Sequence, residues 1–221
     1  MTEQRHAAFL KMIDELHARH LVGVEDVREV WLIRHADAYA GLEALAEGRI
    51  DPPLSERGRA QAARLAARLT PIPLNAVWSS DLRRARETAE VVAAAKGLQV
   101  GVDARLREVR TSWDEGRSAD LNEPGVYPFP EPQEEVAARM KAAVAAVVGG
   151  LDGAGAPVPR AAVVSHNAAI AIYVSSVLGL TWGQLRLMPQ FTSVTVLAVK
   201  GEQVVVQSIG DVTHLAVEVP D

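Results

Sequence analysis

The stretch VWLIRHADA, residues 30–38, places a run of β-type apolar residues directly before Arg34 and His35. The later stretch AAVVSHNAAI, residues 161–170, has the same design and places His166 where the apolar run gives way to a helical pattern. Open α/β sheets bind their ligands at the carboxyl ends of their strands. We therefore expect the arginine and the two histidines to meet at one edge of a sheet.

Short apolar runs alternate with alanine-rich helical patterns from Glu29 onward. This alternation is typical of an α/β protein with a mostly parallel sheet. The last two runs are joined by a turn at Lys200-Gly201 and predict an antiparallel edge. The predicted strands are residues 30–33, 76–78, 100–102, 161–164, 192–199 and 204–209, and the predicted helices are residues 56–69, 81–96, 133–148 and 167–178.

An amphipathic helix is predicted at residues 2–21, before this pattern begins. Apolar stripes of helices usually face a core, so we expect this helix to pack on its own domain; a partner subunit in a homodimer is the alternative. We divide the chain into an N-terminal helical extension, residues 1–27, and a catalytic domain, residues 28–221. The apolar stripe consists of Phe9, Met12, Ile13 and Leu16.

The composition of the 221-residue chain, 48% hydrophobic and 23% charged, fits one folded domain. Its formal net charge of -5 argues against general binding to nucleic acid or to a membrane surface, because both need a surplus of Lys and Arg. The absence of cysteine excludes a thiolate metal site and a cysteine nucleophile, and suits a reducing compartment. No stretch approaches about 18 apolar residues without a charge, so we expect a cytoplasmic protein.

A second arginine belongs to the predicted helix 81–96. Arg84 and Thr88, four residues apart, flank the buried stripe of this helix, and Ser80 or Asp81 can cap its N-terminus. Guanidinium groups match the geometry of phosphate, and neutral imidazole is a competent nucleophile toward phosphorus. Two arginines and two histidines at strand ends therefore predict a pocket for a phosphoryl group.

These motifs, in this order, resemble those of the histidine phosphatase superfamily, also called the phosphoglycerate mutase-like family, and of its phosphatase branch. The resemblance runs from about residue 30 to residue 215 and leaves residues 1–27 outside. It implies a three-layer α/β/α sandwich. The segments that carry it are Arg34-His35, DPPLSERGRAQA (51–62), SSDLRRARETA (79–89), LRE (106–108), VVSHNAAI (163–170) and GDVTHL (210–215).

The resemblance implies a role for each residue of the site. His35 would be the nucleophile that becomes phosphohistidine. The phosphoryl oxygens would be held by Arg34, Arg84 and His166. Glu108 would protonate the leaving oxygen and then act as the base that activates water. No metal ion and no cofactor is implied, and repulsion from the arginines should favour the neutral form of His35.

The chain departs from the family pattern beside both histidines. Ala36 stands where the family usually has Gly, and Ala38 follows where a Thr hydroxyl is common. Asn167 replaces another Gly and would either donate to phosphate or cap the helix. Asp37 would either repel a phosphate dianion or lie in solvent.

Two segments would overhang the pocket and supply residues that select the substrate, unless these are ordinary packing residues. The selection candidates are Tyr39, Arg49, Trp113, Tyr127 and Phe129. The family resemblance includes His214 without a catalytic role, so we expect it to be structural.

Three functions fit this reading: a phosphomonoester hydrolase, a mutase that moves phosphate within a sugar-acid phosphate, and a non-catalytic phosphate binder. A mutase must hold a doubly phosphorylated intermediate and needs extra positive charge over the pocket. Residues 113–135 have the opposite balance, with one basic residue, Arg117, so we expect hydrolysis of a small phosphorylated metabolite. The acidic residues there are Asp114, Glu115, Asp120, Glu123, Glu131, Glu134 and Glu135.

Overall fold

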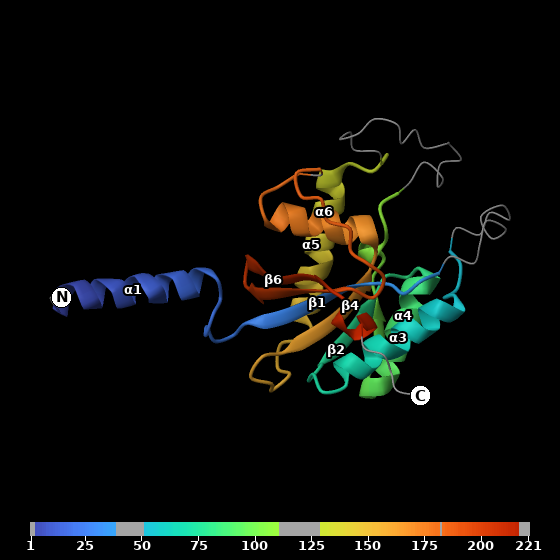
Figure 1. Ribbon diagram of the computed structural model, residues 1–221, viewed down its shortest axis with the longest axis horizontal. Helices are drawn as coiled ribbons and strands as arrows, with labels where there is room; N and C mark the ends of the chain where they lie inside the picture. The colour runs from blue at the N-terminus through green and yellow to red at the C-terminus, as the bar shows by residue number, and fades with distance from the viewer. Residues whose placement is uncertain (1–2, 39–50, 111–128, 182, 217–221) are drawn as a thin grey trace.

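A six-stranded sheet forms the centre of the computed structural model, which describes residues 3–38, 51–110, 129–181 and 183–216. The strands lie in the order β3-β2-β4-β1-β5-β6 (Figure 1). The first four are mutually parallel, and β5 and β6 form the antiparallel edge, as predicted. The strands are β1 (Arg28–Arg34), β2 (Ala76–Ser79), β3 (Val100–Val102), β4 (Arg160–Ser165), β5 (Val194–Lys200) and β6 (Gln203–Asp211).

Two layers of helices cover the sheet, so the predicted three-layer sandwich is confirmed (Figure 1). On one face, α5 (Gln133–Gly149) and α6 (Asn167–Val177) pack together, and on the other face α3 (Glu56–Leu69) packs against α4 (Arg83–Lys96). The short elements η1 (Ala104–Leu106) and α7 (Thr213–Ala216) complete the order.

Strand β1 shows why the middle of each central strand is a continuous apolar run. Val30 and Leu32 belong to the core cluster under α5 and α6, whereas Ile33 belongs to the cluster under α3 and α4. All three side chains are fully buried. A strand with helices on both faces buries successive side chains on opposite sides, so its sequence is a continuous apolar run.

The N-terminal helix forms as predicted, as α1 (Glu3–Arg19), but it projects away from the sheet domain (Figure 1). Its apolar stripe is not covered: Phe9 and Met12 are each 53% exposed and Leu16 is 49% exposed. The expectation that α1 packs on its own domain is therefore wrong. The chain turns after α1 at Leu21, which is buried with Val27 against β5, so the sheet domain anchors the end of the helix but not its stripe. No helix in the described part of the chain is long and apolar enough to cross a membrane.

The N-terminal caps of α3 and α4 differ. Ser55 caps α3 in the usual way, because its hydroxyl accepts the N–H of Gly58 at 2.9 Å. The expectation that Ser80 or Asp81 caps α4 is wrong, because the N-cap residue is Leu82, which has no capping side chain. Ser80 instead contacts a histidine described below, and the carboxylate of Asp81 accepts from Nε of Arg107 at 2.7 Å.

Candidate active site

The site lies where β2, β4 and β1, three adjacent parallel strands, end at the same edge of the sheet. Arg34 is paired in register with Ser165. One more backbone hydrogen bond follows the last pair on both sides of β4. The N–H of His35, after β1, donates to the carbonyl of Ser165, and the N–H of Ser80, after β2, donates to the carbonyl of Val164. The backbone therefore brings the first residues after three distant strands together, as the sequence predicted.

His35 is a buried, neutral imidazole, and one of its ring nitrogens makes a hydrogen bond to the backbone. Its Nδ1 lies 2.7 Å from the carbonyl oxygen of Ala36, which can only accept, so Nδ1 carries the proton. Its Nε2 is then a lone-pair acceptor and receives the Nε–H of Arg84 at 3.2 Å. Burial first, and then the charges of Arg84 and Arg34, lower the pKa of His35 to about 3, against a smaller opposing effect of the Ala36 carbonyl. The ring is thus in the protonation state that a nucleophile requires.

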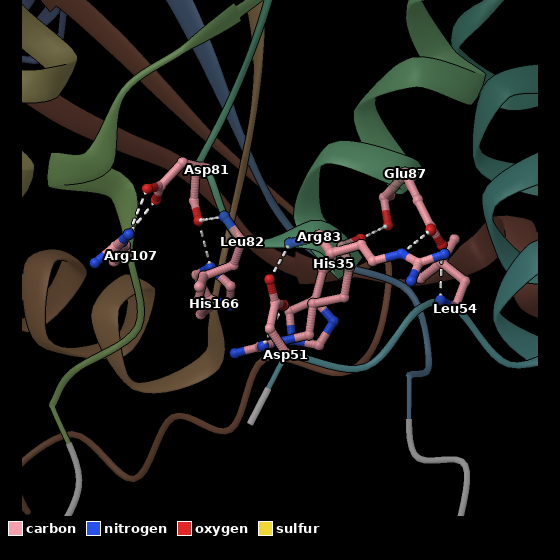
Figure 2. A network of polar contacts seen from close by, with 12 residues as sticks. His35, Asp51, Leu54, Asp81, Leu82, Arg83, Glu87, Arg107 and His166 are labelled. Atoms are coloured by element: carbon pink, nitrogen blue, oxygen red, sulfur yellow. Dashed lines mark hydrogen bonds and ion pairs between the residues drawn. The ribbon is translucent and has the colours of Figure 1, made fainter. Parts of the chain in front are cut away.

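His166 is the second imidazole of the site and is fully buried. The centroids of the His35 and His166 rings are 5.0 Å apart, with the ring planes inclined at 58° (Figure 2). Nε2 of His166 lies 2.8 Å from the hydroxyl of Ser80. Burial, followed by the proximity of His35 and Arg84, holds the pKa of His166 well below its usual value. Both imidazoles are therefore neutral near neutral pH.

Arg84 is held between the nucleophile and an acid. Its Nη1 donates to Asp51 at 3.2 Å, while its Nε donates to His35. The same carboxylate accepts the backbone N–H of Arg83 at 2.7 Å, at the first residue of α4 (Figure 2). Asp51 thus fixes both the start of α4 and the guanidinium that this helix carries toward the site. Asp51 was not predicted to be a site residue, although it begins the segment DPPLSERGRAQA (51–62).

Arg34 is fixed by contacts with Pro189 and Phe191. Its Nη1 donates to the carbonyl of Pro189 at 2.8 Å, and its guanidinium stacks on the ring of Phe191 at 3.9 Å from the ring centroid. Phe191 also contacts His35, with ring centroids 5.7 Å apart. Stacking on an aromatic face orients a guanidinium group without removing its charge. The four predicted core residues, Arg34, His35, Arg84 and His166, therefore gather at one place.

The two alanines that replace family residues pack in a small apolar cluster. Ala36 and Ala38 are buried with Leu54 and Ala62. The N–H of Ala36 donates to the hydroxyl of Thr88 at 3.0 Å, and this hydroxyl donates to the carbonyl of Arg84 at 2.8 Å. Thr88 thus links the segment after the nucleophile to the helix that carries the arginine.

Asp37 does not lie in solvent, because it is only 7% exposed. Its carboxylate accepts from Nε of Arg57 at 2.9 Å and from the hydroxyl of Ser55 at 3.1 Å, and its N–H donates to Gln61 at 2.9 Å. The exposed reading of Asp37 is therefore wrong. The ion pair with Arg57 offsets its charge, which reduces the repulsion that a bound dianion would feel.

The side chain of Glu108 lies at the N-terminus of α6, the helix that begins directly after His166. Its carboxylate accepts the backbone N–H groups of Ala168 at 3.3 Å and Ala169 at 3.0 Å, and also that of Val109 at 3.0 Å. These N–H groups form an anion site at the helix terminus, and the anion that they bind is the side chain of Glu108. The terminus therefore positions the predicted acid and base beside the second histidine.

The backbone around Glu108 is clamped by Arg139 of α5. The guanidinium of Arg139 donates to the carbonyl oxygens of Arg105, Arg107 and Glu108 at 2.7, 2.7 and 3.2 Å. It is itself paired with the buried Glu131 at 2.7 Å. Neither Arg139 nor Glu131 was identified as a site residue from the sequence, because a clamp between segments so far apart leaves no local pattern.

This pairing also corrects part of the charge argument for residues 113–135. Glu131 is neutralised by Arg139 and does not face the pocket as a free charge. Glu134 and Glu135 lie exposed in the first turn of α5, where carboxylates stabilise the helix terminus. The other four acidic residues lie outside the described residues. The three described ones do not supply free negative charge over the pocket, so they do not distinguish a hydrolase from a mutase.

Asn167 is the first residue of α6, and the N-cap residue is His166, so the capping alternative for Asn167 is wrong. Its Nδ2 lies 3.0 Å from the sulfur of Met188, and its Oδ1 is buried without a hydrogen bond to any described residue. Donation to phosphate stays a prediction.

Of the predicted selection residues, Phe129 is half-buried and packs against the core cluster under α5 and α6. Tyr39, Arg49, Trp113 and Tyr127 lie outside the described residues. His214 is buried between Arg68, which donates to its Nδ1 at 3.1 Å, and Thr192, whose hydroxyl lies 3.0 Å from its Nε2. The N–H of Thr192 donates to the carbonyl of Arg34. His214 therefore helps to hold, through Thr192, the backbone of Arg34, in agreement with a structural role.

The arrangement offers two fixed guanidinium groups, a neutral imidazole with an available lone pair and a carboxylate. Such donors stabilise the charge on a transferring phosphoryl group. Within the described residues, no group of three or more His, Asp and Glu side chains is gathered to hold a metal ion.

Comparison with known proteins gives a consistent result. The sequence profile of the histidine phosphatase superfamily (branch 1) matches residues 30–212. A protein of Escherichia fergusonii named "Probable phosphoglycerate mutase GpmB" is 31% identical over 208 residues, covering 85% of this chain and 94% of the relative. The solved mycobacterial glucosyl-3-phosphoglycerate phosphatase is 28% identical, with a TM-score of 0.67 over 83% of this chain and 99% of that one. Phosphoglycerate mutase of Bacillus anthracis, 23% identical with a TM-score of 0.67 over 87% and 96%, shares the fold.

Proposed function

This chain belongs to the histidine phosphatase superfamily, and from that membership we propose that it hydrolyses phosphate monoesters through a phosphohistidine on His35, without a metal ion. One observation carries this proposal. Nδ1–H of His35 donates to the Ala36 carbonyl, so the lone pair of Nε2 is the nucleophile. Nε2 accepts a hydrogen bond from the guanidinium of Arg84, which can instead donate to a bound phosphoryl group. In this proposal residues 28–221 form the catalytic domain.

In the first step, Nε2 of His35 attacks phosphorus, the N–P bond forms and the bond from phosphorus to the ester oxygen breaks. The Glu108 carboxylate takes up a proton when the substrate binds and gives it to the departing oxygen, because an alkoxide is a poor leaving group. In the second step, the Glu108 carboxylate takes a proton from water as the water oxygen attacks phosphorus. The N–P bond breaks, inorganic phosphate leaves, and His35 is again neutral with Nε2 unprotonated.

The charge on the phosphoryl group is stabilised by Arg34, Arg84 and His166. The guanidinium of Arg84 contacts His35 and Asp51, and that of Arg34 stacks on Phe191, which itself contacts His35. Fixed donors of this kind need no reorganisation at the moment of transfer, which is the main source of such stabilisation. The Arg84 bond to Nε2 must break before attack, and the arriving phosphoryl oxygens offer the guanidinium a better acceptor.

The substrate we propose is a small phosphorylated metabolite. Support comes from the 28% identical mycobacterial neighbour, whose name gives a glucosyl-phosphoglycerate as its substrate. The 31% identical relative named as a mutase favours the alternative reaction, transfer of phosphate within a sugar-acid phosphate. A non-catalytic phosphate binder is the third alternative.

Assays on the purified full chain separate these functions. A hydrolase releases inorganic phosphate from p-nitrophenyl phosphate in the presence of a chelator and is inhibited by vanadate. A mutase isomerises 3-phosphoglycerate, and a binder does neither. Unchanged phosphate release by His35→Ala would refute the assignment of the nucleophile, and loss of turnover on chelation would refute the metal-independent mechanism.

We also propose that a second copy of this chain covers the apolar stripe of α1, which makes the protein a homodimer. A helix of 17 residues that projects into water is of marginal stability alone, and covering exposed Phe9, Met12 and Leu16 would stabilise it. The cytoplasmic location and the absence of a nucleic-acid partner remain predictions from composition.

A further inference from the structure

We propose that Ser80 is a positioning residue that sets the tautomer of His166, so that this histidine offers a neutral Nδ1–H donor to the bound oxyanion. The role of the donor rests on the proposed function, whereas the assignment of the tautomer does not. Ser80 and His166 are both fully buried, and the Ser80 hydroxyl lies 2.8 Å from Nε2 of His166.

The hydroxyl of Ser80 has one hydrogen to donate, and its surroundings determine where that hydrogen points. Its oxygen already accepts the N–H of Leu82 at 3.1 Å, at the N-cap of α4. Among the described residues, Nε2 of His166 is the acceptor within reach of the Ser80 hydrogen. The hydroxyl therefore donates to Nε2, and a neutral imidazole that accepts at Nε2 carries its proton on Nδ1.

The opposite tautomer would leave two buried groups unsatisfied. If Nε2 of His166 carried the proton, the hydrogen of Ser80 would have no acceptor in the described part of the chain, and the lone pair of Nδ1 would have no donor. With the proton on Nδ1, a single group remains unsatisfied, namely the Nδ1–H itself. Each buried polar group without a partner is costly, so the second arrangement is favoured.

The remaining unsatisfied group points to a ligand. Nδ1 of His166 is buried and has no hydrogen-bond partner among the described residues, although its ring lies beside the nucleophile and feels the charges of Arg84, Arg139 and Arg34. An oxyanion held by Arg84 next to His35 supplies the missing acceptor. The lowered pKa of His166 agrees with a neutral donor rather than a further cation beside these arginines.

The tautomer can be measured without any assay of activity. Proton–nitrogen correlations within the imidazole rings of the isotope-labelled full chain distinguish Nδ1–H from Nε2–H, and a His166→Asn variant assigns the signals of that ring. We expect wild-type His166 to be protonated at Nδ1 only. In Ser80→Ala we expect the Nε2–H form to become populated, because its competing interaction is gone. Wild-type His166 protonated at Nε2 would overturn the inference outright, whatever the variant does.

The consequence for binding is tested with vanadate as the probe. We expect Ser80→Ala to weaken vanadate binding about tenfold, the effect of losing one hydrogen bond to a charged group, and Ser80→Thr, which keeps the hydroxyl, to restore part of it. The matched control is Ser175→Ala in α6, a buried serine whose hydroxyl donates to the Ala171 carbonyl, and it should bind vanadate as wild type does.

Failure of this inference and failure of the proposed function give different results. If Ser80→Ala keeps both the Nδ1–H tautomer and full vanadate affinity while wild type hydrolyses phosphate esters, the role of Ser80 is wrong and the function stands. If wild type shows the Nδ1–H tautomer but hydrolyses no phosphate ester, the positioning role stands and the function is wrong.

Discussion

Arg84 donates its Nε–H to Nε2 of His35 across 3.2 Å, so the cation that would bind the phosphoryl group also covers the lone pair that would attack it. This contact has two effects in the free protein. The positive charge contributes to the low pKa of His35, and the hydrogen bond masks the nucleophile until an anion draws the guanidinium away. Asp51 accepts a hydrogen bond from Nη1 of the same guanidinium, so Arg84 has a defined position in the free protein.

Replacing Arg84 by lysine should lower kcat/KM for p-nitrophenyl phosphate about 100-fold, because an ammonium group cannot contact Asp51 and a phosphoryl group with the same planar fork. Steady-state kinetics on Arg84→Lys measures this. The control is Arg83→Lys, since the neighbouring side chain is exposed and pairs with Glu87. Equal losses in the two variants would argue against a specific role for Arg84.

The pH dependence of stability should reflect the buried neutral histidines. Folding lowers the pKa of His214 from 6.5 to about 4, chiefly through burial and then through Arg68. The unfolded chain therefore takes up a proton below pH 6.5 that the folded chain refuses until about pH 4, and stability falls as the pH drops through this window. Each such histidine should contribute about 1.4 kcal/mol per pH unit.

Urea unfolding of wild type and His214→Asn between pH 7 and pH 5 checks this value. From pH 7 to pH 5 the variant should lose about 2 kcal/mol less stability than wild type, because the unfolded histidine is only partly protonated at the upper end of this range. Parallel stability curves would show that His214 is not kept neutral by the fold.

The contact between Gly58 and the backbone of Asp37 should tolerate no side chain. A Cβ at Gly58 would lie 1.9 Å from the Asp37 carbonyl oxygen, so one of the two segments must move. We expect Gly58→Ala to destabilise the protein by about 3 kcal/mol or more and to lower kcat/KM, because Asp37 directly follows the nucleophile segment. Gly149→Ala in α5, where a Cβ meets no atom within 4 Å, should leave stability unchanged or slightly raised.

Replacing the exposed apolar residues of α1 should disrupt the proposed dimer. Sedimentation of a Phe9→Ser, Met12→Ser, Leu16→Ser variant should give a monomer where wild type gives a dimer, because the covered area would lose its apolar groups. A control that changes the charged side chains Lys11 and Glu15 to Ser should still associate. A monomeric wild type would refute the homodimer.

Most of the sheet and its helices could be predicted from the sequence, because their patterns are local. The runs around Val30 and Val163 are apolar throughout, as strands buried on both faces require, and α3 begins and ends at the predicted residues. The strand-end positions of His35 and His166 follow from the same patterns, since parallel strands end at one edge.

The caps of α4 and α6 were misplaced by one or two positions, whereas the larger errors concern relations between distant segments. The helix α1 forms with the predicted apolar stripe, but the sequence of the helix does not show whether this stripe packs against the sheet domain. The helix N–H groups after His166 bind the carboxylate of Glu108, a residue some sixty positions earlier, and no local pattern shows this contact. The clamp of Arg139 on that loop and the bond from Ser80 to His166 join residues more than 30 positions apart, so they emerge only from the fold.

The most direct test of the account uses Glu108→Gln with radiolabelled p-nitrophenyl phosphate. Nitrophenolate is a good leaving group that needs no proton, so phosphorylation of the protein should proceed, whereas the attack by water lacks its base. The account predicts a burst of nitrophenolate and an acid-labile, alkali-stable phosphoryl group that peptide mapping places on His35. Label on another residue, or no phosphorylated protein while turnover continues, would contradict it.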